Sequence, residues 1–102
     1  MSPEIPSDQA NIKDRLSATV TGIVQGVGFR YWTARKADRL GLTGTVRNRF
    51  DGAVELVAEG SKSDIQDMLS WLKSSHAPGR VEHVESEVSP ATGEFSEFRI
   101  IG

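Results

Sequence analysis

The chain of 102 residues contains no cysteine and no long apolar run. Without cysteine there is no disulfide, no thiolate metal ligand and no cysteine nucleophile, which is compatible with a reducing compartment. No run approaches the ~20 apolar residues that a membrane span needs, and the N-terminus lacks the charged-then-apolar layout of a secretory signal. We therefore expect a soluble, cytoplasmic protein that does not bind a membrane.

The chain also lacks a strong excess of either charge, since 12 Lys and Arg face 14 Asp and Glu and the formal net charge is -2. No global field attracts nucleic acid, so we expect no nucleic-acid partner, and any anion site must be local. His76 and His83 stand apart from other residues at metal-ligand spacing, and the glutamates between 82 and 87 are typical of a solvated strand face. We therefore expect no metal site.

The length suits one domain with one modest core. Residues 1–14, MSPEIPSDQANIKD, contain two prolines and several polar residues without a usable period. This composition is typical of a flexible tail, so the domain is expected to occupy residues 15–102.

Two segments in the first half of the domain have clear periodicity. Alternation from Leu16 to Val24 predicts a strand, and apolar residues at helical spacing from Phe29 to Leu40 predict a helix, which Gly41 would end as a left-handed C-cap. Alternating runs on either side of Asp51-Gly52 predict an antiparallel hairpin with a two-residue type I′ turn.

The second half repeats the pattern. Ser63 and Gln66 form a candidate capping box ahead of a helix that runs to Leu72, and residues 81–88 and 95–101 are extended runs separated by the turn-rich stretch SPATGE. The order strand, helix, strand, strand, helix, strand predicts an α+β fold, the ferredoxin-like split βαβ sandwich. Its sheet would be mostly antiparallel, with both helices on one face and a short extra C-terminal strand.

A glycine-rich stretch, GIVQGVGFRYW from Gly22 to Trp32, joins the first strand to the first helix. Backbone amides of such a turn and of a helix N-terminus can bind phosphate, and Arg30 adds a permanent planar cation. Neither the nucleotide P-loop ending nor a third fingerprint glycine is present, which disfavours nucleotide hydrolysis. An alternative is that the glycines only form a tight turn and that Arg30 is solvated.

Asn48 shares strand parity with Val46 and Phe50, so it is expected on the helix-covered face, while Arg47 and Arg49 point away. A polar amide there needs hydrogen-bond partners, and it is either a satisfied structural residue or, beside an anion-binding loop, a group that holds a water molecule.

The two stretches GIVQGVGFR and GLTGTVRNRFDGAVEL resemble the acylphosphatase family, and the resemblance extends from about Leu16 to Ile101. The family pattern is Gly-x-Val-Gln-Gly-Val-x-Phe-Arg, followed by Gly-x-x-Gly-x-Val-x-Asn and Asp-Gly-x-Val-Glu. The matching residues are Gly22, Val24, Gln25, Gly26, Val27, Phe29, Arg30, Gly41, Gly44, Val46, Asn48, Asp51, Gly52, Val54 and Glu55.

The resemblance implies hydrolysis of an acyl phosphate to a carboxylate and inorganic phosphate, without a metal or organic cofactor. It implies that Arg30 and the amides of the phosphate-binding loop bind the phosphoryl group, and that Asn48 orients the attacking water. The expected loop comprises Gln25, Gly26, Val27, Gly28, Phe29 and Arg30. We also expect a monomer that inorganic phosphate inhibits.

Two alternatives remain. The stretch GVGFRYW is similar to the aromatic, basic motif of RNA-recognition domains, although that motif belongs on a central strand and here falls at a turn and helix start. The other is an acylphosphatase-like carbamoyl-phosphate module of a hydrogenase-maturation protein, which normally forms part of a much longer chain. Tyr31 and Trp32 either border the mouth of the pocket or serve packing.

Overall fold

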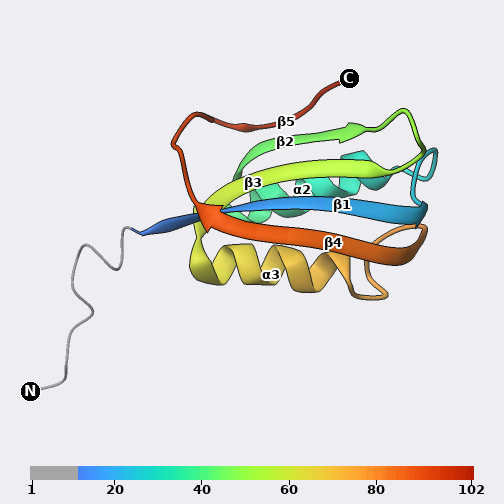
Figure 1. Cartoon of the computed structure of the whole chain (residues 1–102), viewed down its shortest axis with the longest axis horizontal. Helices are drawn as coiled ribbons and strands as arrows, with labels where there is room; N and C mark the ends of the chain where they lie inside the picture. The colour runs from blue at the N-terminus through green and yellow to red at the C-terminus, as the bar shows by residue number, and fades with distance from the viewer. Residues whose placement is uncertain (1–11) are drawn as a thin grey trace, which may run out of the picture.

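The computed structural model describes residues 12–102, which form a five-stranded sheet with two helices on one face (Figure 1). The elements are β1 (Lys13–Ile23), α2 (Phe29–Leu40), β2 (Thr43–Asn48), β3 (Val54–Ser61), α3 (Lys62–Leu72), β4 (Arg80–Pro90) and β5 (Phe98–Ile100). The strand order is β4-β1-β3-β2-β5, and every pair is antiparallel except β2 with β5. This is the expected ferredoxin-like sandwich, with the extra C-terminal strand at one edge.

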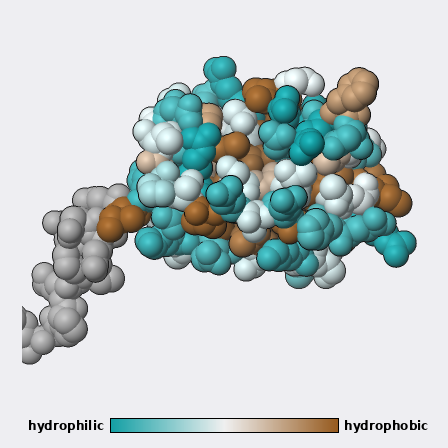
Figure 2. Space-filling model, viewed as in Figure 1, coloured by the Kyte–Doolittle hydropathy of each residue, from teal (hydrophilic) through white to brown (hydrophobic). Residues whose placement is uncertain are grey.

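The core lies between the sheet and the helices. Helix α2 packs on β2 and β5, and α3 packs on β1 and β3. Alternate residues of the strands, such as Leu16, Val20, Val46 and Leu56, are fully buried against helical side chains such as Met68. The opposite face of the sheet carries many hydrophilic side chains between scattered apolar ones (Figure 2). The helices therefore cover one side of the sheet, and the ends of the strands remain accessible.

The strand ends differ from those expected. Strand β1 begins at Lys13, so the expected domain boundary after residue 14 falls inside it, and residues 1–11 of the expected tail lie outside the described residues. Lys13 pairs with Ser61 and Asp14 with Pro90, so partners on both sides extend the strand. Strand β4 is longer than residues 81–88, and β5 is shorter than residues 95–101.

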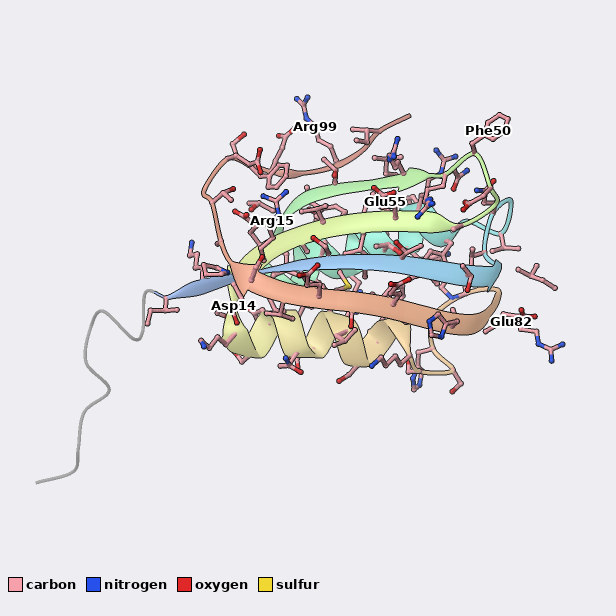
Figure 3. All side chains as sticks on the ribbon, viewed as in Figure 1. Asp14, Arg15, Phe50, Glu55, Glu82 and Arg99 are labelled. Atoms are coloured by element: carbon pink, nitrogen blue, oxygen red, sulfur yellow. The ribbon has the colours of Figure 1, made fainter. Side chains whose placement is uncertain are left out.

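The antiparallel hairpin of β2 and β3 is confirmed, but its predicted two-residue turn is wrong. Arg49 N donates to Ala53 O at 2.7 Å and Gly52 N donates to Arg49 O at 3.3 Å, which makes a longer loop. Among residues 12–102 only glycines have positive φ, so Asp51 does not adopt a type I′ conformation. The tip residue Phe50 is fully exposed and points away from the sheet (Figure 3), which contradicts its expected burial.

The helix ends are fixed by one predicted cap and one unpredicted cap. Gly41 has φ 72° and closes α2 as the expected left-handed C-cap. The capping box at Ser63 and Gln66 is wrong, because Ser61 is the N-cap of α3 and its Oγ accepts from Asp64 N at 3.2 Å. Strand β3 runs directly into α3, so the cap lies two residues earlier than the pattern indicated.

Candidate active site

The connection between β1 and α2 presents backbone N–H groups without acceptors. Gly28 is the N-cap of α2, with φ 78° and no capping side chain. Among the backbone–backbone hydrogen bonds outside the helices and strands of residues 12–102, none is donated by the N–H groups of residues 26–31, and no side chain caps the helix. A helix N-terminus with unpaired donors and the positive end of the helix dipole is a binding site for an anion. The glycine-rich stretch therefore ends at a helix N-terminus with free N–H groups, and its binding of phosphate stays a prediction.

Arg30 and Asn48 line the same pocket, of about 170 Å³, although they lie 18 positions apart in the sequence. The other residues around it are Val24, Gly26, Gly28, Phe29, Tyr31 and Ile100. The Phe29 side chain is 1% exposed and packs beside Trp71 in the core, so Phe29 faces the pocket through its backbone. The pocket brings one cation, one carboxamide and a row of N–H groups together.

The Asn48 side chain has an unmatched acceptor. Its Oδ1 is buried and has no hydrogen-bond partner among the described residues. Asn48 ends β2 and pairs with Val54, so the strand fixes its backbone while its side chain faces the pocket. A buried carbonyl without a partner costs roughly 1–3 kcal/mol, which a fully satisfied structural asparagine would avoid. The Asn48 carbonyl is therefore free to accept a hydrogen bond from a donor such as water.

Arg30 is the cation of this pocket. It is half-buried and forms no ion pair with a carboxylate in residues 12–102. By contrast, Arg47 lies 3.4 Å from Glu55, and Arg49 lies 3.1 Å from Asp51. Since these two neighbours are compensated locally, the positive potential at the pocket comes mainly from Arg30 and the helix N-terminus.

The Gln25 side chain is directed to the hairpin. Its Nε2 donates to Arg49 O at 2.8 Å and to Ala53 O at 2.9 Å, the two residues that close the β2–β3 loop. Gln25 therefore connects the glycine-rich loop to the segment that immediately follows Asn48. Its sequence position indicated a place in the phosphate-binding loop, but nothing in the sequence indicated where its side chain would point.

The other side of the loop rests on the connection from α3 to β4. Gly79 has φ 74°, and a Cβ on it would lie 2.2 Å from Ile23 O and 2.9 Å from Val27 Cγ2. No larger residue fits there without displacing the backbone. Val27, an expected loop residue, is held at this contact and does not line the pocket with Arg30. The loop is thus packed between the hairpin and the α3–β4 connection.

Sequence reasoning missed Ile100 and the position of Val24 in the pocket. Ile100 reaches it because β5 pairs in parallel with β2, which places Ile100 opposite Val46. No local pattern encodes such a long-range parallel register.

Within residues 12–102 no three His, Asp or Glu side chains come together as a metal site, and no helix is long and apolar enough to cross a membrane.

The fold is that of a small ferredoxin-like protein with a pocket between the glycine-rich loop and Asn48, and its likeness to known proteins is specific. A family model described as acylphosphatase matches residues 16–100. An acylphosphatase of Paenarthrobacter aurescens (strain TC1) is 69% identical over 87 residues, covering 85% of this chain and 93% of the relative. The crystal structure of acylphosphatase from Bacillus subtilis has a TM-score of 0.80 and 34% identity, covering 87% of this chain and 99% of that one.

The chain belongs to the acylphosphatase family, a family of hydrolases. A structure of full-length HypF in phosphate- and nucleotide-bound form also matches, with a TM-score of 0.80 and 26% identity, covering 88% of this chain but 12% of that one. The RNA-recognition alternative does not fit the fold, because Phe29 is buried and Phe29 to Trp32 form the first turn of α2 rather than a central strand.

Proposed function

We propose that this protein hydrolyses acyl phosphates with Arg30 and the loop amides as the phosphate-binding groups and Asn48 as the residue that orients water. The observation that carries the proposal is the shared pocket, where an uncompensated guanidinium, unpaired N–H groups and a buried unpartnered carbonyl oxygen meet. The first two suit a phosphoryl group, and the third suits a hydrogen-bond donor such as water.

The reaction needs few protein groups. Water oxygen forms a bond to phosphorus while the bond from phosphorus to the acyl oxygen breaks, and the products are carboxylate and inorganic phosphate. The leaving carboxylate has a conjugate acid of pKa about 4, so it departs without a general acid. In a loose transition state, catalysis rests on positioning and on stabilising charge at the equatorial oxygens. Arg30 and the amides supply the charge stabilisation, and Asn48 Oδ1 accepts a hydrogen bond from the attacking water.

The residues of the loop have two different roles in this proposal. Gly26, Gly28, Phe29 and Arg30 surround the phosphoryl group, while Gln25 and Val27 hold the loop in place through the contacts described above. We also propose that the enzyme acts as a monomer in the cytoplasm and that inorganic phosphate inhibits it competitively, because product and substrate share the loop. No step uses a metal or an organic cofactor.

An activity assay with two variants tests the proposal. We expect turnover of acetyl phosphate in the presence of a chelator, and a loss of about 10³-fold or more in kcat/KM for Arg30→Ala, comparable to the loss of a transition-state arginine elsewhere. Asn48→Ala should lower kcat by about 10²–10³-fold, comparable to the loss of one transition-state hydrogen bond.

Arg99→Ala is the matched control, because Arg99 is exposed and pairs with Glu97 outside the pocket. It should retain wild-type activity, and circular dichroism should show all variants folded. Full activity in a folded Arg30→Ala protein would refute the mechanism, and purely noncompetitive inhibition by phosphate would refute its binding to the loop.

A further inference from the structure

A second pocket, of about 320 Å³, lies between the two helices. Its lining residues are Trp32, Arg35, Lys36 and Arg39 from α2, Trp71 from α3, and His76 and Pro78 from the connection to β4. This volume falls within the ~300–1,000 Å³ typical of small-molecule sites, whereas the pocket at Arg30 is about half as large and suits a phosphoryl group. Two indole rings and a group of cations face the same space.

The cations of this pocket lack compensating carboxylates. Trp32, Lys36 and Arg39 follow the i, i+4, i+7 spacing of a single helix face. Among residues 12–102 no carboxylate oxygen lies within 4.0 Å of a side-chain nitrogen of Lys36, Arg39 or Arg35. Arg35 and Arg39 are like charges at i, i+4, which destabilises a helix. Asp38 lines a neighbouring surface pocket with Arg35 and Arg39, but it does not line this one. In a chain of net charge -2, this pocket therefore concentrates cations without a carboxylate among its lining residues.

The two pockets adjoin at the first turn of α2. Trp32 Cδ1 lies 3.6 Å from the position that a Cβ on Gly28 would occupy, and Gly28 lines the pocket of Arg30. Tyr31 lines that pocket too, and its ring meets the Trp32 ring edge-on at 5.3 Å. Helix α2 packs on β2 and β5 on one side, where Asn48 lies, and on α3 on the other.

In-line displacement at phosphorus places the attacking water and the leaving oxygen on opposite sides. If Asn48 orients water from the β2 side, the acyl group departs away from β2, and the pocket between the helices adjoins the first turn of α2 through Trp32. We propose that the pocket between the helices binds the acyl group and that its cations select acyl phosphates carrying a second anionic group at the far end. This inference rests on the proposed function, since it assumes the role of Asn48.

The length of the helix sets the size of that acyl group. Lys36 follows Arg30 by six residues, or about 9 Å along the axis, and helical side chains lean toward the N-terminus, so the gap between the loop and the Lys36 ammonium is shorter than that. A chain of about four carbons that ends in a carboxylate spans this distance, with its methylene groups beside the indole of Trp32. Succinyl phosphate has this chemistry, and butyryl phosphate has the same carbon count without the second charge.

Steady-state kinetics with succinyl, butyryl and acetyl phosphate test the inference. The wild type should show a kcat/KM for succinyl phosphate about tenfold above that for butyryl phosphate, chiefly through KM, because partly exposed cations contribute modest Coulomb attraction. The double variant Lys36→Gln/Arg39→Gln should lose this preference. Its kcat/KM for acetyl phosphate and its inhibition constant for inorganic phosphate should stay within about twofold of the wild type, because neither residue lines the pocket of Arg30.

The matched control is Lys13→Gln/Lys62→Gln, which removes two exposed cations outside both pockets and should retain the preference. The inference fails if the wild type treats succinyl and butyryl phosphate alike, if the preference survives in Lys36→Gln/Arg39→Gln, or if the control loses it equally. If the wild type does not hydrolyse acetyl phosphate at all, the proposed function fails instead. The acetyl phosphate measurement therefore separates the two failures.

Discussion

The two ends of the sheet differ in whether a buried polar side chain has hydrogen-bond partners. At one end Glu59 is 4% exposed, and hydrogen-bond donors surround its carboxylate. At the other end the buried Oδ1 of Asn48 has no partner in the described residues, and the N–H groups opposite it are also unpaired. The first arrangement stabilises the fold, and the second leaves hydrogen-bonding capacity for a substrate.

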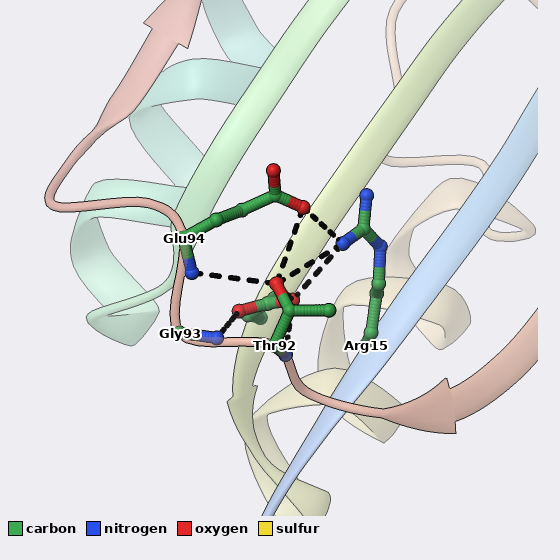
Figure 4. A network of polar contacts seen from close by, with 5 residues as sticks. Arg15, Thr92, Gly93 and Glu94 are labelled. Carbon is green, nitrogen blue, oxygen red and sulfur yellow. Dashed lines mark hydrogen bonds and ion pairs between the residues drawn. The ribbon is translucent and has the colours of Figure 1, made fainter.

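Glu59 is buried beneath the connection from β4 to β5, whose residues Thr92 and Gly93 donate to its carboxylate. Figure 4 shows Thr92, Gly93 and Glu94 of this connection beside Arg15. Thr92 N donates to Oε2 and Gly93 N to Oε1, each at 2.9 Å, and Thr92 Oγ1 donates to Oε2 at 3.0 Å. Arg15, directly opposite Glu59 on β1, lies 3.4 Å from the same carboxylate and also pairs with Glu94. The carboxylate thus holds the connection that places β5 beside β2.

A buried polar group is tolerable when its partners belong to the same chain, as at Glu59. At Asn48 the described residues supply no partner, and under the proposed function the attacking water supplies it. Removing the Asn48 side chain should therefore lower activity and leave stability nearly unchanged, whereas removing the Glu59 side chain should lower stability and leave activity nearly unchanged. Both quantities must be measured for both variants.

The largest expected effect is the contrast between Asn48→Ala and Glu59→Ala. Asn48→Ala should lower kcat by about 10²–10³-fold and change the free energy of unfolding by less than about 1 kcal/mol, since the lost carbonyl had no partner. Glu59→Ala should retain activity within about threefold, because Glu59 does not line the pocket and the pairing of β5 with β2 still holds Ile100 there. It should lose about 2 kcal/mol, because it leaves donors of Thr92 and Gly93 unpaired.

Urea unfolding and acetyl phosphate hydrolysis measure both quantities on the same preparations. Glu55→Ala is the control for removing a strand glutamate, since Glu55 also lies on β3 but is only half-buried and contacts exposed arginine side chains. The comparison fails if Asn48→Ala is as destabilised as Glu59→Ala, or if Glu59→Ala loses activity in a folded state.

The next effect concerns how the active-site end is held together. Gln25→Met removes the donor to Arg49 O and Ala53 O while retaining side-chain length. We expect kcat to fall about tenfold, because small displacements of positioned groups reduce rates strongly. The inhibition constant for inorganic phosphate should change little, because the Gln25 side chain does not face the phosphoryl pocket.

Gln66→Met on the exposed face of α3 is the control and should leave kcat unchanged. A fall in kcat with phosphate binding retained would show that Gln25 positions the loop and does not contact the phosphoryl group. An equal loss of kcat and phosphate affinity would show that Gln25 contacts the phosphoryl group, and unchanged kcat would show that the loop needs no link to the hairpin.

The sequence predicted what local patterns encode. The helical spacing from Phe29 to Leu40, the Gly41 cap and the antiparallel hairpin depend on neighbouring residues, and the structure confirms them. The sequence also allowed the proximity of Arg30 and Asn48 to be predicted, because strand parity and the loop position restrict where each side chain can lie. Their chemical roles stay predictions that the assays above address.

The remaining features depend on contacts between distant segments. The parallel register that brings Ile100 to the pocket and the crossing connection that buries Glu59 follow from the path of the chain after β4. Strand parity placed Phe50 on the covered face, but the strand ends at Asn48, so Phe50 lies at the tip of the loop. The Ser61 cap was missed because two serines compete in the sequence. Ser61 is followed three positions later by Asp64, and Ser63 is followed three positions later by Gln66.

The smallest expected effect is the acid sensitivity that Glu59 gives to its end of the sheet. Burial alone raises the pKa of Glu59, but the N–H groups of Thr92 and Gly93, the Thr92 hydroxyl and the charge of Arg15 together hold its pKa below the usual value. A carboxyl whose pKa is lowered by folding stabilises the protein above its unfolded pKa of about 4.3 and loses that contribution as the pH falls through the folded pKa.

The free energy of unfolding should therefore decline as the pH falls below about 4.3, and Glu59→Gln should show a shallower decline because it has no proton to bind at that position. Asn48→Ala should keep the wild-type slope, since the asparagine amide does not titrate in this range. Urea unfolding at a series of pH values measures all three slopes. Because Glu94 also has a lowered pKa, owing first to its hydrogen bond from Arg15, some slope should remain in Glu59→Gln. A slope in Glu59→Gln identical to the wild type would show that Glu59 does not link the stability of this end to proton binding.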